Sequence, residues 1–180
     1  MFSRLIVYLI VIVFSINGYS QQINCFDSTN KKGDFDYSNT TGNDFTDYWS
    51  KSSTGTFAIE NRHHFYGSGA LRVDVADNNR NSVTLTTTNN CSIDVDNNDT
   101  WNISMYVMGE VGDQLAFSLI DSNGSSVGST THTIRYKGFH YVRVKFNTTA
   151  NSDTSRLKIN FHHSGTYFID RLVLTEGDFK

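Results

Sequence analysis

The fold is decided by a stretch in which apolar and polar side chains alternate, Trp101-Asn102-Ile103-Ser104-Met105-Tyr106-Val107. Successive side chains of a β-strand point to opposite faces of a sheet, so this alternation predicts a half-buried strand. Residues that share the parity of Ile103 are expected in a hydrophobic core, and this group includes Trp101. The opposite parity, which includes Ser104 and Tyr106, is expected to face solvent or a ligand.

The same period of two recurs on both sides of this stretch. It is found in the segments 70–75, 83–85, 115–119, 141–146, 157–161 and 168–174. Clusters of Asn, Asp, Ser and Gly separate the segments and predict turns, and no long window carries the stripe of an amphipathic helix. The sequence therefore predicts an all-β protein, an antiparallel two-sheet β-sandwich or jelly roll of roughly eight to nine strands.

Composition excludes several classes of protein. The 180 residues include 15 Lys+Arg against 18 Asp+Glu, and 57 residues are Asn, Ser or Thr. Charged residues make up only 18% of the chain, which argues against coiled coils and charge-rich disordered segments. A net charge of −3 gives no electrostatic basis for binding nucleic acid. Abundant Asn, Ser and Thr instead suit the exposed faces and turns of a sheet protein.

The first 20 residues have the pattern of a secretory signal peptide. Arg4 precedes an apolar run over residues 5–16, and small residues follow up to Ser20. The run is shorter than the roughly 20 residues of a membrane-spanning helix, although an uncleaved anchor is an alternative. We expect cleavage near Ser20, a single domain over residues 21–180, and a secreted, periplasmic or cell-surface protein without membrane attachment.

Export would permit a disulfide between the two cysteines of the chain, Cys25 and Cys91. With two cysteines there is one possible connectivity. Closing this loop would stabilise the fold by about 4 kcal/mol in the chain-entropy description. The alternative is a pair of thiols that do not bond to each other.

Several fragments, in order along the chain, resemble carbohydrate-binding modules of families 4, 9 and 22. Gly33-Asp34-Phe35-Asp36 resembles the Asn-Gly-Asp-Phe-Glu opening of these modules, and Gly67-Ser68-Gly69 resembles their glycine-rich turn. The stretch 101–107 is similar to their Tyr-x-x-Ser-Phe strand. The segment 167–174 resembles their Tyr-x-Ile-Asp-Asp-Val-x-Leu close. The resemblance implies a galactose-binding-domain-like jelly roll, in agreement with the alternation.

The resemblance also implies a structural calcium ion where the first and last strands meet. Calcium takes six to eight oxygen ligands from carboxylates and carbonyls. The matching positions provide Asp36 and Asp170 as carboxylate ligands, with Gly33 and Ser68 as carbonyl donors. Arg171 stands where these modules have a second acid. The alternative is that the acids cap turns.

Modules of this kind bind sugars with aromatic rings that stack on pyranose faces, beside polar groups that bond the hydroxyls. The implied carbohydrate-binding residues are Tyr106, His162, Asn160 and Arg143 on outward positions of a concave sheet, with His64 and Tyr66 at a loop rim. Each of these is equally compatible with an ordinary surface residue. The outward cations Arg143, Lys145 and Lys158 would suit an acidic or sulfated polysaccharide, or form a solvated surface.

The leading functional prediction is an exported, non-catalytic protein that binds a polysaccharide and works beside co-secreted polysaccharide-degrading enzymes. A small jelly-roll lyase or hydrolase is an alternative, with His64 and Tyr66, or His162 and Tyr106, as base and acid. A structural or adhesive sandwich that binds a protein is another. The sequence carries no Gly-x-Ser-x-Gly elbow, metal-spaced His/Glu motif or phosphate loop, so whether the protein is an enzyme is left open.

Overall fold

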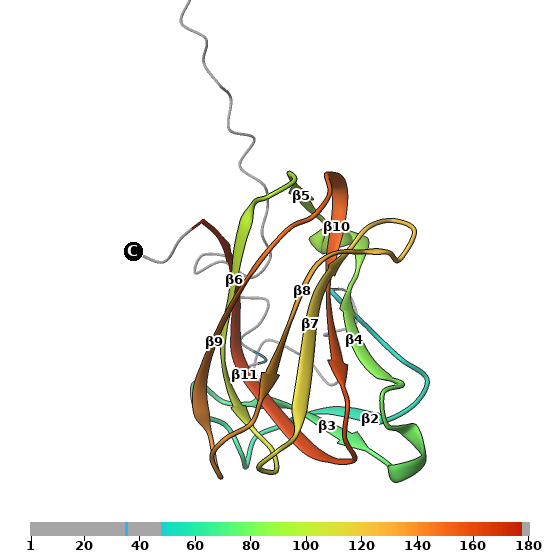
Figure 1. Ribbon diagram of the computed structural model, residues 1–180. Helices are drawn as coiled ribbons and strands as arrows, with labels where there is room; N and C mark the ends of the chain where they lie inside the picture. The colour runs from blue at the N-terminus through green and yellow to red at the C-terminus, as the bar shows by residue number, and fades with distance from the viewer. Residues whose placement is uncertain (1–34, 36–47, 178–180) are drawn as a thin grey trace, which may run out of the picture.

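The computed structural model describes Phe35 and residues 48–177, which form two antiparallel sheets packed face to face (Figure 1). The six-stranded sheet has the order β1 (Trp49–Lys51), β4 (Val83–Thr87), β10 (Ser152–Phe161), β7 (Gln114–Ile120) and β8 (Ser126–Thr133), and β5 (Ile93–Val95) also pairs with β10. The five-stranded sheet has the order β2 (Thr56–Glu60), β3 (Ala70–Val75), β11 (Gly165–Glu176), β6 (Thr100–Met108) and β9 (His140–Asn147). Two 3-10 helices, η3 (Asp77–Asn79) and η4 (Asn89–Cys91), complete the described elements. No helix of the described part is long and apolar enough to cross a membrane.

The predicted all-β sandwich is confirmed, with eleven strands in the described residues where about eight to nine were expected. Two of the additional strands, β1 and β5, are three residues long, which is too short to show alternation. Strand β8 lacks the apolar alternation that predicts the other strands, because Ser and Thr fill most of it and Val127 is its only buried apolar residue. Next to Val127, a Cβ added to Gly128 would lie 3.0 Å from the carbonyl oxygen of Asn147, so glycine allows this edge strand to approach the other sheet.

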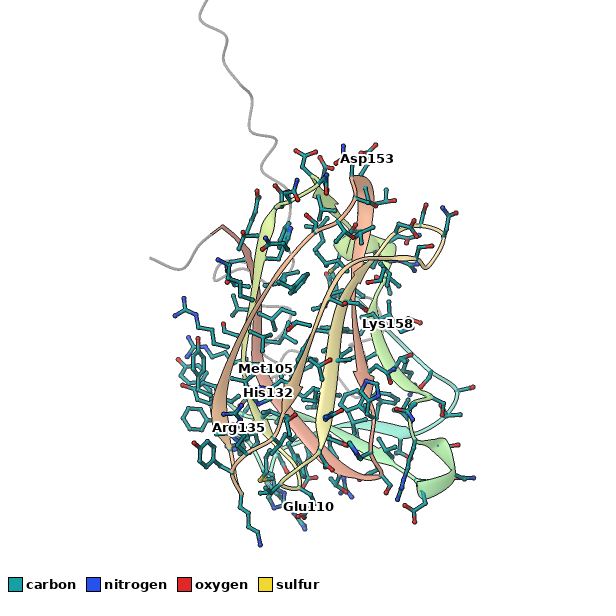
Figure 2. The ribbon with its side chains drawn as sticks, in the orientation of Figure 1. Met105, Glu110, His132, Arg135, Asp153 and Lys158 are labelled. Atoms are coloured by element: carbon teal, nitrogen blue, oxygen red, sulfur yellow. The ribbon has the colours of Figure 1, made fainter. Side chains whose placement is uncertain are left out.

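The core lies between the sheets and contains the residues that the alternation assigns to it. Met105, which Figure 2 shows between the two layers, is fully buried, and Trp49 and Trp101 are each 1% exposed. The predicted core residues are all buried except Val144, which is partly buried and packs against the core: Ile103, Met105, Val107, Leu115, Phe117, Leu119, Val142, Val144, Phe146, Leu157, Ile159 and Phe161. Burial of such large side chains is the dominant stabilising contribution in a sandwich.

Strand β11 lies at the centre of the five-stranded sheet and contains an irregularity that positions the candidate site. Asp170 is paired with Tyr106, but the next paired residues are Val173 and Ser104, so β11 has one more residue than β6 between them. This is a β-bulge. Arg171 at the bulge has a φ of 52° and is exposed, while the following residue returns to the core. The bulge therefore places both Asp170 and Arg171 on the outer side of the sheet.

Candidate functional site

A cluster of aromatic rings covers the outer side of β6, β9 and β11. We call it the aromatic face and define it by Phe65, Tyr66, Tyr106, Tyr141 and Arg171. Tyr106 and Tyr141 are directly opposite on β6 and β9, with ring centroids 5.3 Å apart. Phe65, from the loop between β2 and β3, stacks on Tyr106 at 3.7 Å with an interplanar angle of 15°. The exposed fractions of Phe65, Tyr66 and Tyr141 are 50%, 51% and 55%, so large apolar surfaces meet solvent side by side.

The loop that carries two of these rings is held by a buried carboxylate. Asp170 is only 1% exposed, and its Oδ2 accepts hydrogen bonds from the backbone N–H groups of Phe65 at 2.8 Å and Tyr66 at 2.7 Å. Hydrogen bonds to a charged acceptor are stronger than neutral ones, and a buried charge requires such partners. The fold thus holds the backbone that carries the two rings before any ligand arrives.

Arg171 extends this cluster with a positive charge. Its guanidinium carbon lies 4.1 Å from the centroid of the Tyr66 ring, a cation–π contact. The left-handed backbone conformation costs a residue with a side chain on the order of 1–3 kcal/mol, and it persists where the surroundings enforce it. Here the enforcing feature is the register shift between β11 and β6. The aromatic face therefore carries a cation whose position is set by the sheet.

A hollow of about 320 Å³ lies in this face, lined by Ser104, Tyr106, Tyr141, Arg171 and Val173. Its lining combines ring surface, three hydroxyl groups and one guanidinium, and no carboxylate is among the described residues that line it. This is the mixture of apolar surface and a few polar groups that small-molecule and sugar sites use.

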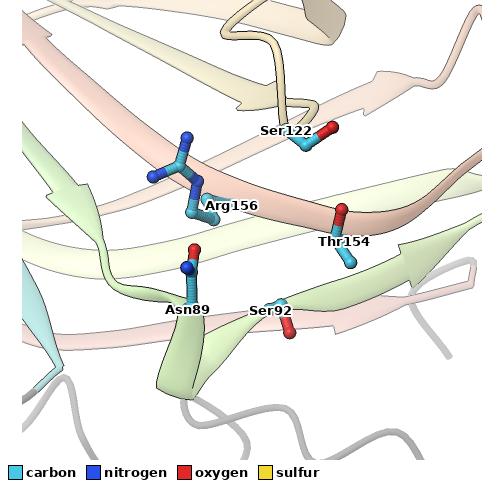
Figure 3. Close-up of a pocket in the computed structure, with 5 residues that line it drawn as sticks. All are labelled: Asn89, Ser92, Ser122, Thr154 and Arg156. Atoms are coloured by element: carbon cyan, nitrogen blue, oxygen red, sulfur yellow. The ribbon is translucent and has the colours of Figure 1, made fainter.

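A second hollow lies on the six-stranded sheet and differs in chemistry. It has a volume of about 380 Å³ and is lined by Asn89, Ser92, Ser122, Thr154 and Arg156. Figure 3 shows Arg156 and Thr154 on the same strand, with the Asn89 side chain extending toward them. None of the residues that line this hollow in the described part of the chain is aromatic, so these residues offer hydrogen bonds without a stacking surface.

The structure does not bring the predicted sugar-binding residues to one face. Tyr106 and Arg143 lie on the outer side of the five-stranded sheet, and His64 and Tyr66 are exposed in the adjacent loop. Asn160, by contrast, is on β10 of the other sheet.

His162 directly follows β10, and its ring contacts the Asn81 side chain. Because strand β10 pairs with β4 and β7 rather than with β6, the expectation of one shared face is wrong. Because His162 follows β10 and Tyr106 is on β6, a strand of the other sheet, the two cannot act together as the base and acid of a lyase. The same separation also places Lys158 apart from Lys145, since Lys158 is on β10 and Lys145 is on β9.

Three members of the aromatic face were not identified from the sequence. Tyr141 shares the outward parity of Arg143, so the alternation contained the signal for it. Phe65 stands between His64 and Tyr66, which are both predicted carbohydrate-binding residues. Arg171 departs from the pattern of the modules, and no local sequence pattern predicts the bulge that exposes it.

The predicted calcium site and disulfide fall partly outside the described residues. This applies to Gly33, Asp36 and Cys25. Asp170 uses one carboxylate oxygen for the loop amides, and no group of three or more His, Cys, Asp or Glu side chains suited to a metal ion is found within residues 48–177 or at Phe35. Cys91 is buried. The calcium ion, the carbonyl role of Ser68 and the disulfide therefore stay predictions.

No family model matches the sequence, and no curated protein does either. Solved structures do resemble the fold. The arabinose-bound α-L-arabinofuranosidase MgGH51 aligns with 82% of this chain at a TM-score of 0.71 and 14% identity. A CBM4 structure aligns with 72% of the chain at a TM-score of 0.54 and 13% identity. The CBM22-1–GH10 modules of the Clostridium thermocellum xylanase Xyn10B, complexed with xylohexaose, align with 73% of the chain at a TM-score of 0.52 and 12% identity.

The extent of these matches differs among the three structures. The chain spans 94% of the CBM4 structure but only 26% of the arabinofuranosidase and 26% of the xylanase fragment. At identities this low the likeness concerns the fold alone. It confirms a jelly roll of the type found in carbohydrate-binding modules.

Proposed function

We propose that this protein binds a polysaccharide through the aromatic face. The observation that carries the proposal is the cluster of three rings, Phe65, Tyr66 and Tyr141, each about half exposed on one outer sheet surface. The C–H faces of pyranose rings are apolar and stack on aromatic side chains, while their hydroxyls need hydrogen-bond partners at the edge. Ser104 and Arg171, in the hollow beside Tyr106 and Tyr141, supply such partners.

Preorganisation of the face supports this proposal. Binding is weakened whenever side chains or loops must be ordered by the ligand, at about 0.5–1.5 kcal/mol for each flexible side chain. Phe65 is already stacked on Tyr106, and the Asp170 carboxylate already holds the loop backbone. A sugar chain would therefore meet a surface that needs little rearrangement.

The structural neighbours add support of a general kind. The CBM4 structure shares the jelly roll over nearly its whole length, and the xylanase modules are complexed with xylohexaose. We further propose the finer role predicted from the sequence, an exported protein that binds without catalysis beside polysaccharide-degrading enzymes. Export depends on residues 1–20, which lie outside the described residues.

Affinity electrophoresis of the purified protein on a panel of soluble polysaccharides tests the proposal. At least one polysaccharide should retard the protein, and Tyr141→Ala should weaken that binding by about tenfold, the loss expected for a central aromatic contact. Thr131→Ala is the matched control, because Thr131 is an exposed residue of β8 on the opposite sheet.

Two results would contradict the proposal. One is the absence of binding to every polysaccharide tested. The other is an equal loss in the Tyr141→Ala and Thr131→Ala variants, which would place the site elsewhere. Release of new reducing ends or unsaturated sugars during the same incubations would show that the protein is an enzyme.

A further inference from the structure

The hollow in the aromatic face is rich in hydrogen-bond donors and contains a fixed positive charge. Arg171 can only donate hydrogen bonds, and the hydroxyls of Ser104, Tyr106 and Tyr141 can each donate one. The guanidinium of Arg171 packs over the ring of Tyr66, with its central carbon 4.1 Å from the ring centroid. A guanidinium held in this way keeps the edge of its planar fork available to a ligand.

The carboxylates of the same outer surface are already engaged elsewhere. Asp170 accepts the two backbone N–H groups of the loop. At the β2–β3 edge of the same sheet, the guanidinium of Arg72 forms ion pairs with the carboxylates of Glu60 at 3.4 Å and Asp74 at 3.1 Å. Among the described residues that line the hollow, Arg171 is the one charged side chain, and none of the others is acidic.

The backbone at Arg171 strengthens the case for a ligand. A φ of 52° would be adopted more easily by Gly or Asn, yet the chain carries the longest cationic side chain there. Strained residues of this kind concentrate at ligand sites, where the surrounding structure fixes them in a useful direction. The bulge directs this side chain to the rings and not along the strand.

We propose that the sugar bound at the aromatic face is anionic, and that its carboxylate or sulfate group binds Arg171 in the hollow while the pyranose ring stacks on the neighbouring aromatic side chains. This inference rests on the proposed function, because it names the class of polysaccharide for the same site. A planar guanidinium matches either oxyanion with two parallel N–H···O bonds. Uronic acid polymers and sulfated polysaccharides share this chemistry.

Isothermal titration of the purified protein with three sets of polymers tests the inference. Polygalacturonate and alginate supply carboxylates, carrageenan supplies sulfates, and xylan and mixed-linkage glucan are neutral. An acidic polymer should bind, and Arg171→Gln should weaken its binding by at least about tenfold, since charge-assisted hydrogen bonds are lost. The affinity of Arg171→Lys for the acidic polymer should lie between those of the wild type and Arg171→Gln, because lysine keeps the charge but lacks the planar fork of donors.

Arg156→Gln is the matched control, because Arg156 is the cation of the hollow on the opposite sheet. It should leave the affinity for the acidic polymer unchanged. Thermal melting of each variant shows whether the chain still folds, and Arg171→Lys provides a second test if the glutamine variant does not. Carboxylate and sulfate polymers both support the inference, and their relative affinities identify the source of the anion.

The outcomes separate this inference from the proposed function. Binding that is confined to neutral polymers and is lost in Tyr141→Ala leaves the function standing and overturns the anionic class. Binding of acidic polymers that falls equally in the Arg171→Gln and Arg156→Gln variants shows unspecific charge attraction and also overturns it. Binding of no polymer at all overturns both.

Discussion

The two outer surfaces of the sandwich arise from the same alternation and yet differ in their aromatic content. The five-stranded sheet presents Phe65, Tyr66 and Tyr141, all about half exposed, beside a cation. The six-stranded sheet presents mostly Ser, Thr and Asn, and the described residues that line its hollow include an arginine but no aromatic residue. A period of two therefore identifies the side chains that face outward from the core, but it does not predict what they bind. On the five-stranded sheet, that property depends on the loop that carries Phe65 and Tyr66 and on the bulge in β11 at Arg171.

The largest expected difference between the two surfaces concerns the aspartates that hold their loops. Asp170→Ala should lower the free energy of unfolding by about 2–3 kcal/mol, because two backbone N–H groups lose a buried, charged acceptor. Asp121 is the matched residue of the other sheet, and its Oδ1 accepts from Asn123 and Ser125 in an exposed turn. Asp121→Ala should cost under about 1 kcal/mol. Urea unfolding of both variants measures the two values.

Equal losses in the two aspartate variants would contradict this view of the aromatic face. They would mean that the loop carrying Phe65 and Tyr66 is no more firmly held than an ordinary surface turn. Tryptophan fluorescence can follow the unfolding, since Trp49 and Trp101 are both in the core and report on the whole sandwich.

A smaller effect, of opposite sign on the two sheets, is expected from glycine substitutions at the two arginines. Arg171→Gly should raise the free energy of unfolding by about 1 kcal/mol, because glycine adopts a positive φ without strain. Arg156→Gly should lower it by about 0.5–1 kcal/mol, because Arg156 is inside a regular strand. Chemical denaturation distinguishes the two signs, and a loss of stability in Arg171→Gly would show that the lost cation–π contact with Tyr66 outweighs the relief of backbone strain.

The smallest effect concerns the seam where the edge strands of the two sheets meet. His132 on β8 and His140 on β9 have ring centroids 6.1 Å apart. Burial lowers the pKa of His132, and the charges of His140 and Arg135 lower it further. The folded state therefore binds fewer protons than the unfolded state, and stability should fall as the pH drops below about 6.5.

His132→Gln should reduce this acid sensitivity by under about 1 kcal/mol, because the ring is partly exposed and its interactions are screened. Melting temperatures measured between about pH 5 and pH 8 provide the comparison. A wild-type protein whose stability rises on acidification over this range would contradict the lowered pKa.

The alternation around Ile103 and Met105 was sufficient to predict the sandwich and its core, because a buried face forces a strict parity on each strand. It was not sufficient to assign strands to sheets. Asn160 and Tyr106 have the same outward parity, and only hydrogen bonding between segments far apart in the chain places them on opposite sides. The exposure of Arg171 depends on a register shift between two strands, which no local pattern of residues encodes.

The position of β11 also has a consequence for how the molecule assembles. In the described five-stranded sheet, β11 is the strand that joins the β2–β3 pair to the β6–β9 pair. Strand β11 follows both pairs in the chain and provides Asp170 and Arg171 as well as the pairing. Long-range strand pairing of this kind is a slow step in folding. A chain without β11 would lack Asp170 and Arg171 as well as the strand that joins the two pairs, so it would have no assembled aromatic face to offer a ligand.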